Sequence, residues 1–254
     1  MRLFILLFLL NVLVFTGCEK TVGGGDDDTN EIPIPFVSPD DSATVPTNRL
    51  SEAEWSTRHS QKSTNPVYNQ KIIFIGDSIT QQWETSGRGL TQWNELNVKY
   101  DNKLTNLGFS ADQTQHVIWR LQNGEFPEGI NPEYVVLMIG TNNANQWHMP
   151  QSIAAGIGEI VRIINRASPK TKILLFSIFP RGSGNMDART IINNRTNDII
   201  INYDGYLNIQ YVDITGSYLN PDGNLKTELF TDNLHLNSAG YEVWKNKLIE
   251  IIGG

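Results

Sequence analysis

The stretch Lys71-Ile72-Ile73-Phe74-Ile75-Gly76-Asp77-Ser78-Ile79-Thr80 decides the fold of this chain. After Lys71, residues 72–75 form an apolar run rich in β-branched residues, which predicts a strand at 71–75 buried on both faces of a parallel sheet. Gly76 then permits a sharp turn, and Ser78 stands where a helix would begin. A serine there is well placed to be a nucleophile, because free N–H groups at a helix N-terminus favour negative charge. The alternative is that Ser78 only caps the helix.

The rest of the chain repeats this alternation of apolar runs and amphipathic segments. Further strands are expected at residues 103–107, 134–139, 172–178 and 209–212. Helices are expected at residues 50–64, 114–121, 151–166, 187–203 and 238–251. Strand and helix alternate throughout, which predicts an α/β fold, a three-layer α/β/α sandwich around a five-stranded parallel sheet.

Composition narrows the class of protein. The chain has 254 residues and 39% hydrophobic content, enough for one domain with a sizeable core. A net charge of −7 argues against nucleic acid as a partner, because no basic surface is left to neutralise phosphates. The single cysteine, Cys18, excludes an internal disulfide.

Residues 1–17 have the pattern of a secretory signal peptide. Arg2 precedes an apolar run over residues 3–15, which is shorter than the roughly 20 residues that a membrane-spanning helix needs. The ending Thr16-Gly17-Cys18 resembles the bacterial lipobox, which implies lipidation at Cys18 and an exported lipoprotein anchored to a membrane, periplasmic or at the cell surface. An ordinary signal peptide with an incidental cysteine is the alternative.

Residues 18–49 are predicted to be a flexible tether. Glycines and aspartates fill residues 23–28, and four prolines follow between residues 33 and 46. Such a composition favours an extended, unpacked chain. The folded domain is therefore expected to occupy residues 50–254.

A base for a nucleophilic serine is available near the C-terminus. Asp232 and His235 are three residues apart in a polar loop before the last helix. An aspartate on one ring nitrogen fixes the histidine tautomer and leaves the other nitrogen free to take the serine proton. A capping aspartate beside a surface histidine is the alternative interpretation.

Donors for an oxyanion are expected at the ends of the first three strands. They are the backbone N–H groups of Ser78 and Gly108 and the side-chain amide of Asn142. Taken singly, Gly108 could be a plain turn residue and Asn142 a plain loop residue. Their occurrence at successive strand ends favours a common site.

These blocks together resemble the GDSL (SGNH) hydrolase superfamily. They are Gly76-Asp77-Ser78, Gly108, Gly140-Thr141-Asn142 and Asp232-Asn233-Leu234-His235. Residues 106–114, 116–125 and 140–143 further resemble the catalytic subunits of platelet-activating-factor acetylhydrolase. The resemblance implies a flavodoxin-like fold, Ser78 as nucleophile, His235 as base, Asp232 as its orienting group, and no metal or cofactor.

The expected activity is a serine esterase that removes short acyl groups, most of all acetyl. Export favours acetylated carbohydrate as the substrate, while a lipid acetylhydrolase or lysophospholipase-like acylhydrolase is the runner-up. A catalytically silent glycan-binding lipoprotein is a third reading. Candidates for lining the substrate pocket are Asn143, Trp147, His148 and Arg181, whereas Asp77 is expected to be structural and His116 to pack or to face solvent.

Overall fold

The computed structural model describes residues 31–64 and 68–253. Its sheet has five strands, all parallel, in the order β2-β1-β3-β4-β5. Their bounds are β1 Ile72–Gly76, β2 Leu104–Gly108, β3 Tyr134–Met138, β4 Lys172–Phe176 and β5 Ile209–Val212. This order is the flavodoxin-like one, in which ligands bind where neighbouring connections diverge, beyond the carboxyl ends of β1 and β3. The predicted fold class is confirmed.

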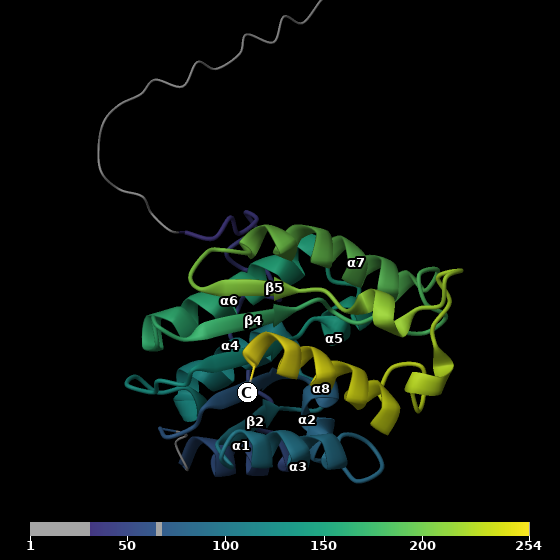
Figure 1. The fold of residues 1–254 in the computed structure, drawn as a ribbon. Helices are drawn as coiled ribbons and strands as arrows, with labels where there is room; N and C mark the ends of the chain where they lie inside the picture. Colours follow the sequence, from purple (N-terminus) through teal and green to yellow (C-terminus); the bar gives the residue numbers. More distant parts are fainter. Residues whose placement is uncertain (1–30, 65–67, 254) are drawn as a thin grey trace, which may run out of the picture.

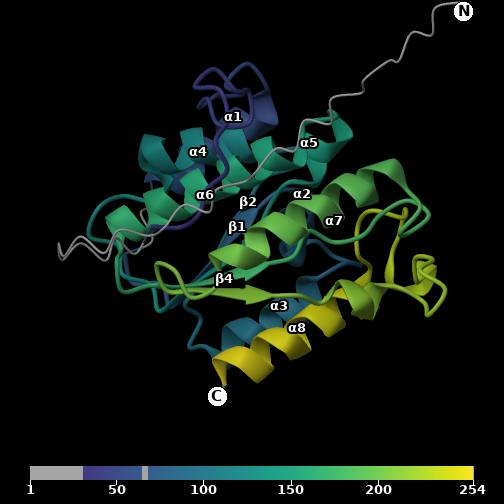
Figure 2. The same ribbon diagram turned by 90° about the horizontal axis from the view of Figure 1, so that it is seen from above.

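The helices form one layer on each face of this sheet (Figures 1 and 2). In Figure 2, α4, α6 and α7 lie on one side of the strands, and α3 and α8 lie together on the other. The α-helices are α1 Ala53–Thr64, α2 Ser78–Gln81, α3 Leu90–Lys99, α4 Thr114–Arg120, α5 Thr141–Asn145, α6 Pro150–Ala167, α7 Ala188–Ile200 and α8 Ser238–Ile252. Short helical turns are η1 Gln82–Glu84, η2 Leu121–Glu125, η3 Ile201–Tyr203, η4 Thr215–Tyr218 and η5 Thr227–Leu229.

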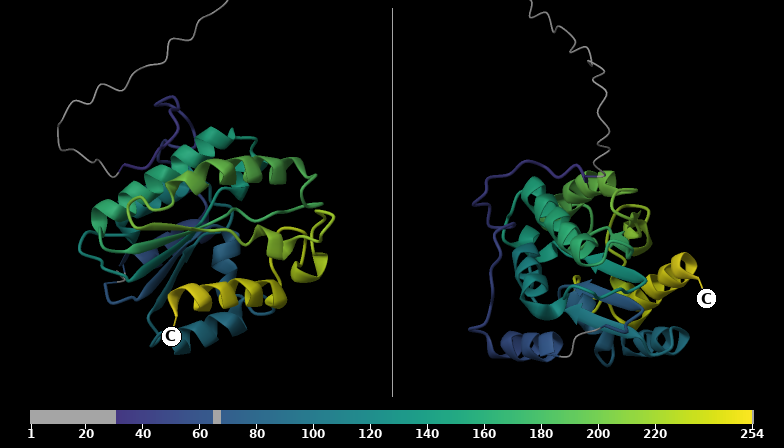
Figure 3. Two further views of the ribbon diagram at one scale, coloured as in Figure 1. Left: turned by 45° about the horizontal axis from the view of Figure 1, so that its top comes forward. Right: turned by 90° about the vertical axis from the view of Figure 1, so that its left-hand side faces the viewer.

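Strand β1 contributes to a core on each of its faces, as its unbroken apolar run predicts. Ile73 and Ile75 pack with α4 and α6, whereas Ile72 and Phe74 pack with the tryptophans and tyrosines of η1, α3 and α8. All five residues of β1 are buried. Figure 3 shows the sheet enclosed between these two helical layers. The strand is therefore held centrally, and its carboxyl end is fixed in space.

The N-terminal segment does not behave as a tether over its described part. Ile32 is 3% exposed and Ala43 is fully buried, and the carbonyl oxygen of Ala43 accepts a hydrogen bond of 2.7 Å from Thr114 Oγ1. Asp41 accepts a further bond of 2.6 Å from Ser152 Oγ. The prediction of an unpacked chain is thus wrong for residues 31–49, because scattered apolar residues between the prolines cover α4 and α6. Residues 1–30, with Cys18, lie outside the described residues.

Candidate active site

Ser78 is the first residue of α2, directly beyond the carboxyl end of β1. Asp77 caps this helix, since its Oδ1 accepts a 2.9 Å hydrogen bond from the backbone N–H of Ile79. The strand can turn here only at a glycine: a Cβ on Gly76 would collide with the Thr80 hydroxyl and with the carbonyl of Met138. The tight turn places the Ser78 hydroxyl at the sheet edge, 5% exposed.

The structure brings Ser78, His235 and Asp232 together as the sequence predicts. The Ser78 Oγ lies 2.9 Å from His235 Nε2, although 157 positions separate the two residues. On the other side of the ring, His235 Nδ1 lies 2.8 Å from Asp232 Oδ2. An ionised carboxylate can only accept, so Nδ1 carries the proton and Nε2 faces the serine as an acceptor.

The Asp232–His235 loop is held mainly by its own residues. Asp232 Oδ1 accepts from the backbone N–H groups of Leu234 and His235, and Thr231 N–H donates to the carbonyl of His235. Partial burial would raise the pKa of Asp232, but the hydrogen bonds from His235 outweigh burial and lower that pKa below its usual range. The carboxylate therefore stays ionised while its side chain is 48% exposed.

Gly108 does not offer the oxyanion donor that the sequence predicts. Its N–H is buried and donates to Asn106 Oδ1 at 2.8 Å. A Cβ at this position would collide with the backbone of Thr80 and Gln81, so Gly108 is required for the close approach of α2 to β2. The prediction for Gly108 is contradicted by this geometry.

The free donor of this turn is the backbone N–H of Ala111. Ser110 N–H donates to Gln81 Oε1 at 2.6 Å, and Asp112 N–H donates to the carbonyl of Phe109. Ala111 N–H has no partner among the described residues, and its φ of +61° turns the chain sharply. Sequence reasoning missed Ala111, and an alanine followed by an aspartate carries no signal of such a conformation.

Asn142 stands at the matching position after β3. One of its amide N–H groups donates to the carbonyl of Asp112 at 2.9 Å, which fixes the side chain and leaves its second N–H free. Ala111 follows β2 and Asn142 follows β3, the two strands that flank β1 in the sheet. Ala111 and Asn142 line the same hollow, and their free N–H groups, with the backbone N–H of Ser78, are the candidate donors for an oxyanion.

Of the four residues predicted to line the pocket, Asn143 does not reach it. Asn143 is fully buried, and its amide contacts Thr114 and Gln115. His148 contacts Asn143 through Nδ1 and Ser42 through Nε2, so its ring connects α5 to the N-terminal segment. The prediction for Asn143 is wrong because its side chain is buried, whereas His148 is partly exposed and stays a prediction. Trp147 is 61% exposed and stays a prediction.

Arg181 lies close to the site. Its Nη1 donates to the carbonyl and the hydroxyl of Thr141, each at 3.3 Å. Burial lowers the pKa of Arg181, and the carboxyls of Asp77 and Asp232 are among the acidic groups that act against this lowering. The guanidinium therefore lies within electrostatic range of both carboxyls and stays a candidate for contact with substrate.

Asp77 is a buried carboxyl beside the nucleophile. Oδ1 accepts from Ile79, whereas Oδ2 is buried without a hydrogen-bond partner among the described residues. Burial raises the pKa of Asp77 to about 7. A protonated Oδ2 explains how the group is tolerated, since a neutral carboxyl loses far less solvation than a charged one.

Beneath the turn at residues 109–112 lies a network of buried charges. Asp112 Oδ2 accepts from Arg120 Nε at 2.7 Å, and its Oδ1 accepts from Trp55 Nε1 at 2.8 Å and from Arg49 Nη1 at 3.0 Å. Arg120 also contacts Glu125, which in turn lies 2.8 Å from His59 Nδ1. The side chains of Asp112, Arg120 and Glu125 are fully buried. This network clamps the turn that carries Ala111 and was not predicted from the sequence.

Within residues 31–64 and 68–253, no group of three or more histidine, cysteine, aspartate or glutamate side chains could hold a metal ion. No helix within these ranges is long and apolar enough to cross a membrane.

Comparison with known proteins agrees with this geometry. The model of the GDSL-like Lipase/Acylhydrolase family matches residues 74–243. The chain is 30% identical over 234 residues to platelet-activating factor acetylhydrolase IB subunit alpha2 of Rattus norvegicus, covering 89% of this chain and 91% of the relative.

Two solved structures share the fold. A GDSL-like lipase from Bacteroides thetaiotaomicron has a TM-score of 0.61 at 17% identity, covering 79% of this chain and 96% of the other. An acetyl-xylooligosaccharide esterase from Geobacillus Stearmophilus has a TM-score of 0.58 at 18% identity, covering 73% and 94%. From the family match, this chain belongs to the GDSL-like lipase/acylhydrolase family and is a carboxylic ester hydrolase.

Proposed function

We propose that this chain is a serine esterase whose nucleophile is Ser78. The observation that carries the proposal is the 2.9 Å contact between Ser78 Oγ and His235 Nε2, with Asp232 on the far side of the ring. His235 takes the hydroxyl proton as Oγ bonds to the ester carbonyl carbon, and returns it to the departing alcohol. Water then hydrolyses the acyl-serine by the same proton path.

The oxyanion is assigned to three donors: the backbone N–H groups of Ser78 and Ala111 and the amide of Asn142. Ala111 replaces Gly108 in this role because the N–H of Gly108 is bound to Asn106. Donors fixed in advance stabilise the charge that develops on the carbonyl oxygen without reorganising during the reaction. The bond from Asn142 to the Asp112 carbonyl supplies this fixed geometry.

The substrate is assigned to short-chain acyl esters, above all O-acetyl groups on carbohydrate. Two compared proteins are named for acetyl removal, one an acetyl-xylooligosaccharide esterase and one a platelet-activating factor acetylhydrolase. A lipid acetylhydrolase is the second candidate, favoured by the sequence identity to the latter protein. The two are separated by comparing hydrolysis of acetylated xylan fragments with hydrolysis of a short-chain acetyl phospholipid.

The test of the nucleophile is Ser78→Ala, assayed with p-nitrophenyl acetate. Removal of a serine nucleophile is expected to lower kcat by about 10³-fold or more, because the acyl-enzyme cannot form. Folding is checked by circular dichroism. Turnover that survives the substitution would refute the assignment of Ser78 as nucleophile. If the protein is instead a catalytically silent glycan-binding lipoprotein, neither the wild type nor Ser78→Ala should hydrolyse the ester.

Export as a lipoprotein is also part of the proposal. It is supported by the apolar leader at residues 3–15 and by the small residues before Cys18. Labelled palmitate should enter the wild-type chain in a bacterial host and not the Cys18→Ser variant. Equal labelling of both chains would show that Cys18 is not the lipidated residue.

A further inference from the structure

A polar hollow of about 340 Å³ adjoins the proposed oxyanion donors. This volume is within the usual range for sites that bind small molecules. Two of its lining residues, Ala111 and Asn142, are those donors. The others are Arg49, Glu52, Gln113, His116, Asn145 and Gln146. Apart from the alanine, every lining side chain is an amide, a charged group or an imidazole, which is unlike the apolar wall that an acyl chain needs.

Arg49 is the cation that lines this hollow, and its charge is already matched. Its Nε and Nη2 donate to the two carboxylate oxygens of Glu52, and its Nη1 donates to Asp112 and to the carbonyl of Ser110. Hydrogen bonds from Arg49 also lower the pKa of Glu52, which keeps that carboxylate ionised. Four of the five guanidinium N–H groups are thus bound, so little is left to hold a phosphate.

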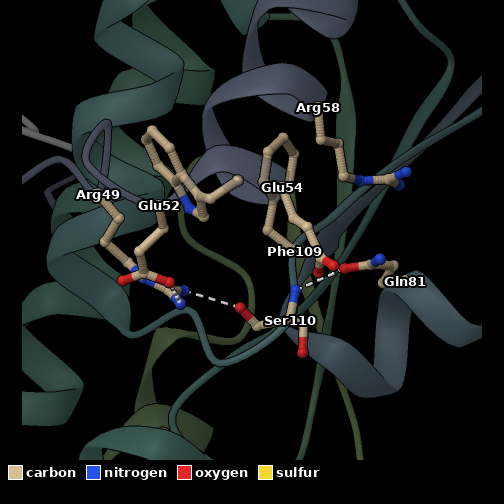
Figure 4. Close-up of a pocket in the computed structure, with 8 residues that line it drawn as sticks. Arg49, Glu52, Glu54, Arg58, Gln81, Phe109 and Ser110 are labelled. Atoms are coloured by element: carbon tan, nitrogen blue, oxygen red, sulfur yellow. Dashed lines mark hydrogen bonds and ion pairs between the residues drawn. The ribbon is translucent and has the colours of Figure 1, made fainter.

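Arg49 also lines a second hollow, of about 270 Å³, together with Arg58 and Phe109 (Figure 4). Arg49 reaches the carbonyl of Ser110 from one side, and Gln81 reaches the N–H of Ser110 from the other. The Arg49–Glu52 pair therefore forms a wall common to both hollows and is fixed on the turn that carries Ala111.

His116 contributes a neutral donor. Its Nδ1 accepts from the backbone N–H of Gln113 at 3.0 Å, which places the ring proton on Nε2. Burial, together with nearby Arg49 and Arg120, lowers the pKa of His116 to about 4. The ring is therefore uncharged near neutral pH, and Nε2–H has no hydrogen-bond partner among the described residues. The sequence predicts only that His116 packs or faces solvent, and it does not reveal that His116 lines a hollow with a free Nε2–H.

We propose that this hollow binds the polyhydroxylated alcohol part of the ester, so that the substrates are acetylated sugars rather than acetylated phospholipids. The inference rests on the proposed function and deepens it. Sugar hydroxyls match a lining of amides, a neutral imidazole N–H and a paired carboxylate, because a hydroxyl can donate to the carboxylate and accept from the imidazole N–H. A phospholipid would need an unpaired cation for its phosphate and apolar surface for its chain, and this lining offers neither.

The test uses the full mature chain with His116→Asn and Asn145→Ala, assayed on acetylated xylo-oligosaccharide. Asparagine keeps an acceptor for Gln113 N–H but removes the donor at Nε2, and Asn145 is exposed, so both variants should fold. Each lost hydrogen bond is expected to raise KM about fivefold with little change in kcat. The matched control is Asn94→Ala, an exposed asparagine on α3, which should leave KM unchanged.

A second variant probes the charge balance. Glu52→Gln leaves the charge of Arg49 partly unmatched, so the ratio of kcat/KM on anionic acetylated pectin fragments to that on neutral acetylated xylan fragments should rise about threefold or more. An unchanged ratio would contradict the inference that Glu52 neutralises the charge of Arg49 in this hollow.

The outcomes separate this inference from the proposed function. If Ser78→Ala abolishes hydrolysis but His116→Asn and Asn145→Ala leave KM for the oligosaccharide unchanged, the esterase stands and the sugar subsite is wrong. If kcat on p-nitrophenyl acetate falls as much as kcat/KM on the oligosaccharide, the two residues act on the reacting centre instead. Preference of the wild type for the acetyl phospholipid would also overturn the inference. Activity that does not depend on Ser78 would overturn the proposed function first.

Discussion

The two halves of the candidate site are built in opposite ways. The Asp232–His235 loop is partly exposed and is held mainly by hydrogen bonds among its own residues. The turn at residues 109–112 is instead anchored by side chains outside it, Arg49 and Trp55 from a distant part of the chain and Arg120 from α4. A local loop can be altered without disturbing the fold, whereas a turn clamped by buried charges shares its stability with the core.

The largest effect on activity is expected on the exposed half. Asp232→Asn keeps an acceptor for the backbone N–H groups of the loop but presents an amide to His235 Nδ1. That amide favours the wrong ring tautomer, with the proton on Nε2, so kcat/KM should fall about 10³- to 10⁴-fold. Unfolding by denaturant should change by less than about 1 kcal/mol because the side chain is half exposed. A fall of less than about tenfold would contradict the assigned role.

The largest effect on stability is expected on the buried half. Arg120→Met removes the cation between Asp112 and Glu125 and leaves both carboxylates buried without it. Removing one partner from a buried ion pair costs about 3–5 kcal/mol, measurable by denaturant unfolding. Lys247→Met is the control, because Lys247 pairs with the exposed Glu250 on α8 and should change the free energy of unfolding by about 1 kcal/mol at most.

The same Arg120→Met variant should also lower kcat, because the turn carrying Ala111 loses its clamp. Asp232→Asn, in contrast, should affect activity alone. If Arg120→Met unfolds with the wild-type free energy, the buried network is not what holds the turn.

The contrast also explains what the sequence could predict. The strand at 71–75 and the Asp232–His235 spacing are local patterns, and the structure has both a strand and a contact there. Which N–H of the second turn stays free depends on Asn106 and Gln81, which occupy the N–H groups of Gly108 and Ser110. No local pattern reveals that competition, and so Gly108 was assigned in place of Ala111. Arg49 was missed because its segment has the composition of a tether.

A smaller effect is expected on how stability depends on pH, because the pKa values of Asp77 and Asp232 shift in opposite directions. The pKa of Asp77 is raised to about 7 by burial, whereas hydrogen bonds from His235 lower the pKa of Asp232. A raised folded-state pKa contributes stability at low pH that is lost as pH rises toward 7. Between pH 5 and pH 7, wild type should therefore lose roughly 2 kcal/mol relative to Asp77→Asn, at about 1.4 kcal/mol per pH unit and allowing for partial titration.

Asparagine is the suitable replacement because it keeps the Oδ1 acceptor for Ile79 N–H and cannot ionise. The difference between the two proteins, measured by urea unfolding at pH 5, 6, 7 and 8, cancels the titration of other groups. A difference that stays constant with pH would show that Asp77 is not protonated in the folded chain.

The smallest effect concerns the backbone of the two halves. Ala111 has a φ of +61° and Asn233, in the exposed loop, has a φ of +59°. Alanine tolerates this region less well than asparagine, so Ala111→Gly should stabilise the chain by about 0.5–1 kcal/mol and Asn233→Gly by less. Thermal unfolding resolves such a difference, and kcat of Ala111→Gly should stay within twofold because the backbone N–H is retained. A stable but much slower Ala111→Gly enzyme would mean that catalysis depends on the rigidity of this turn as well as on its free N–H.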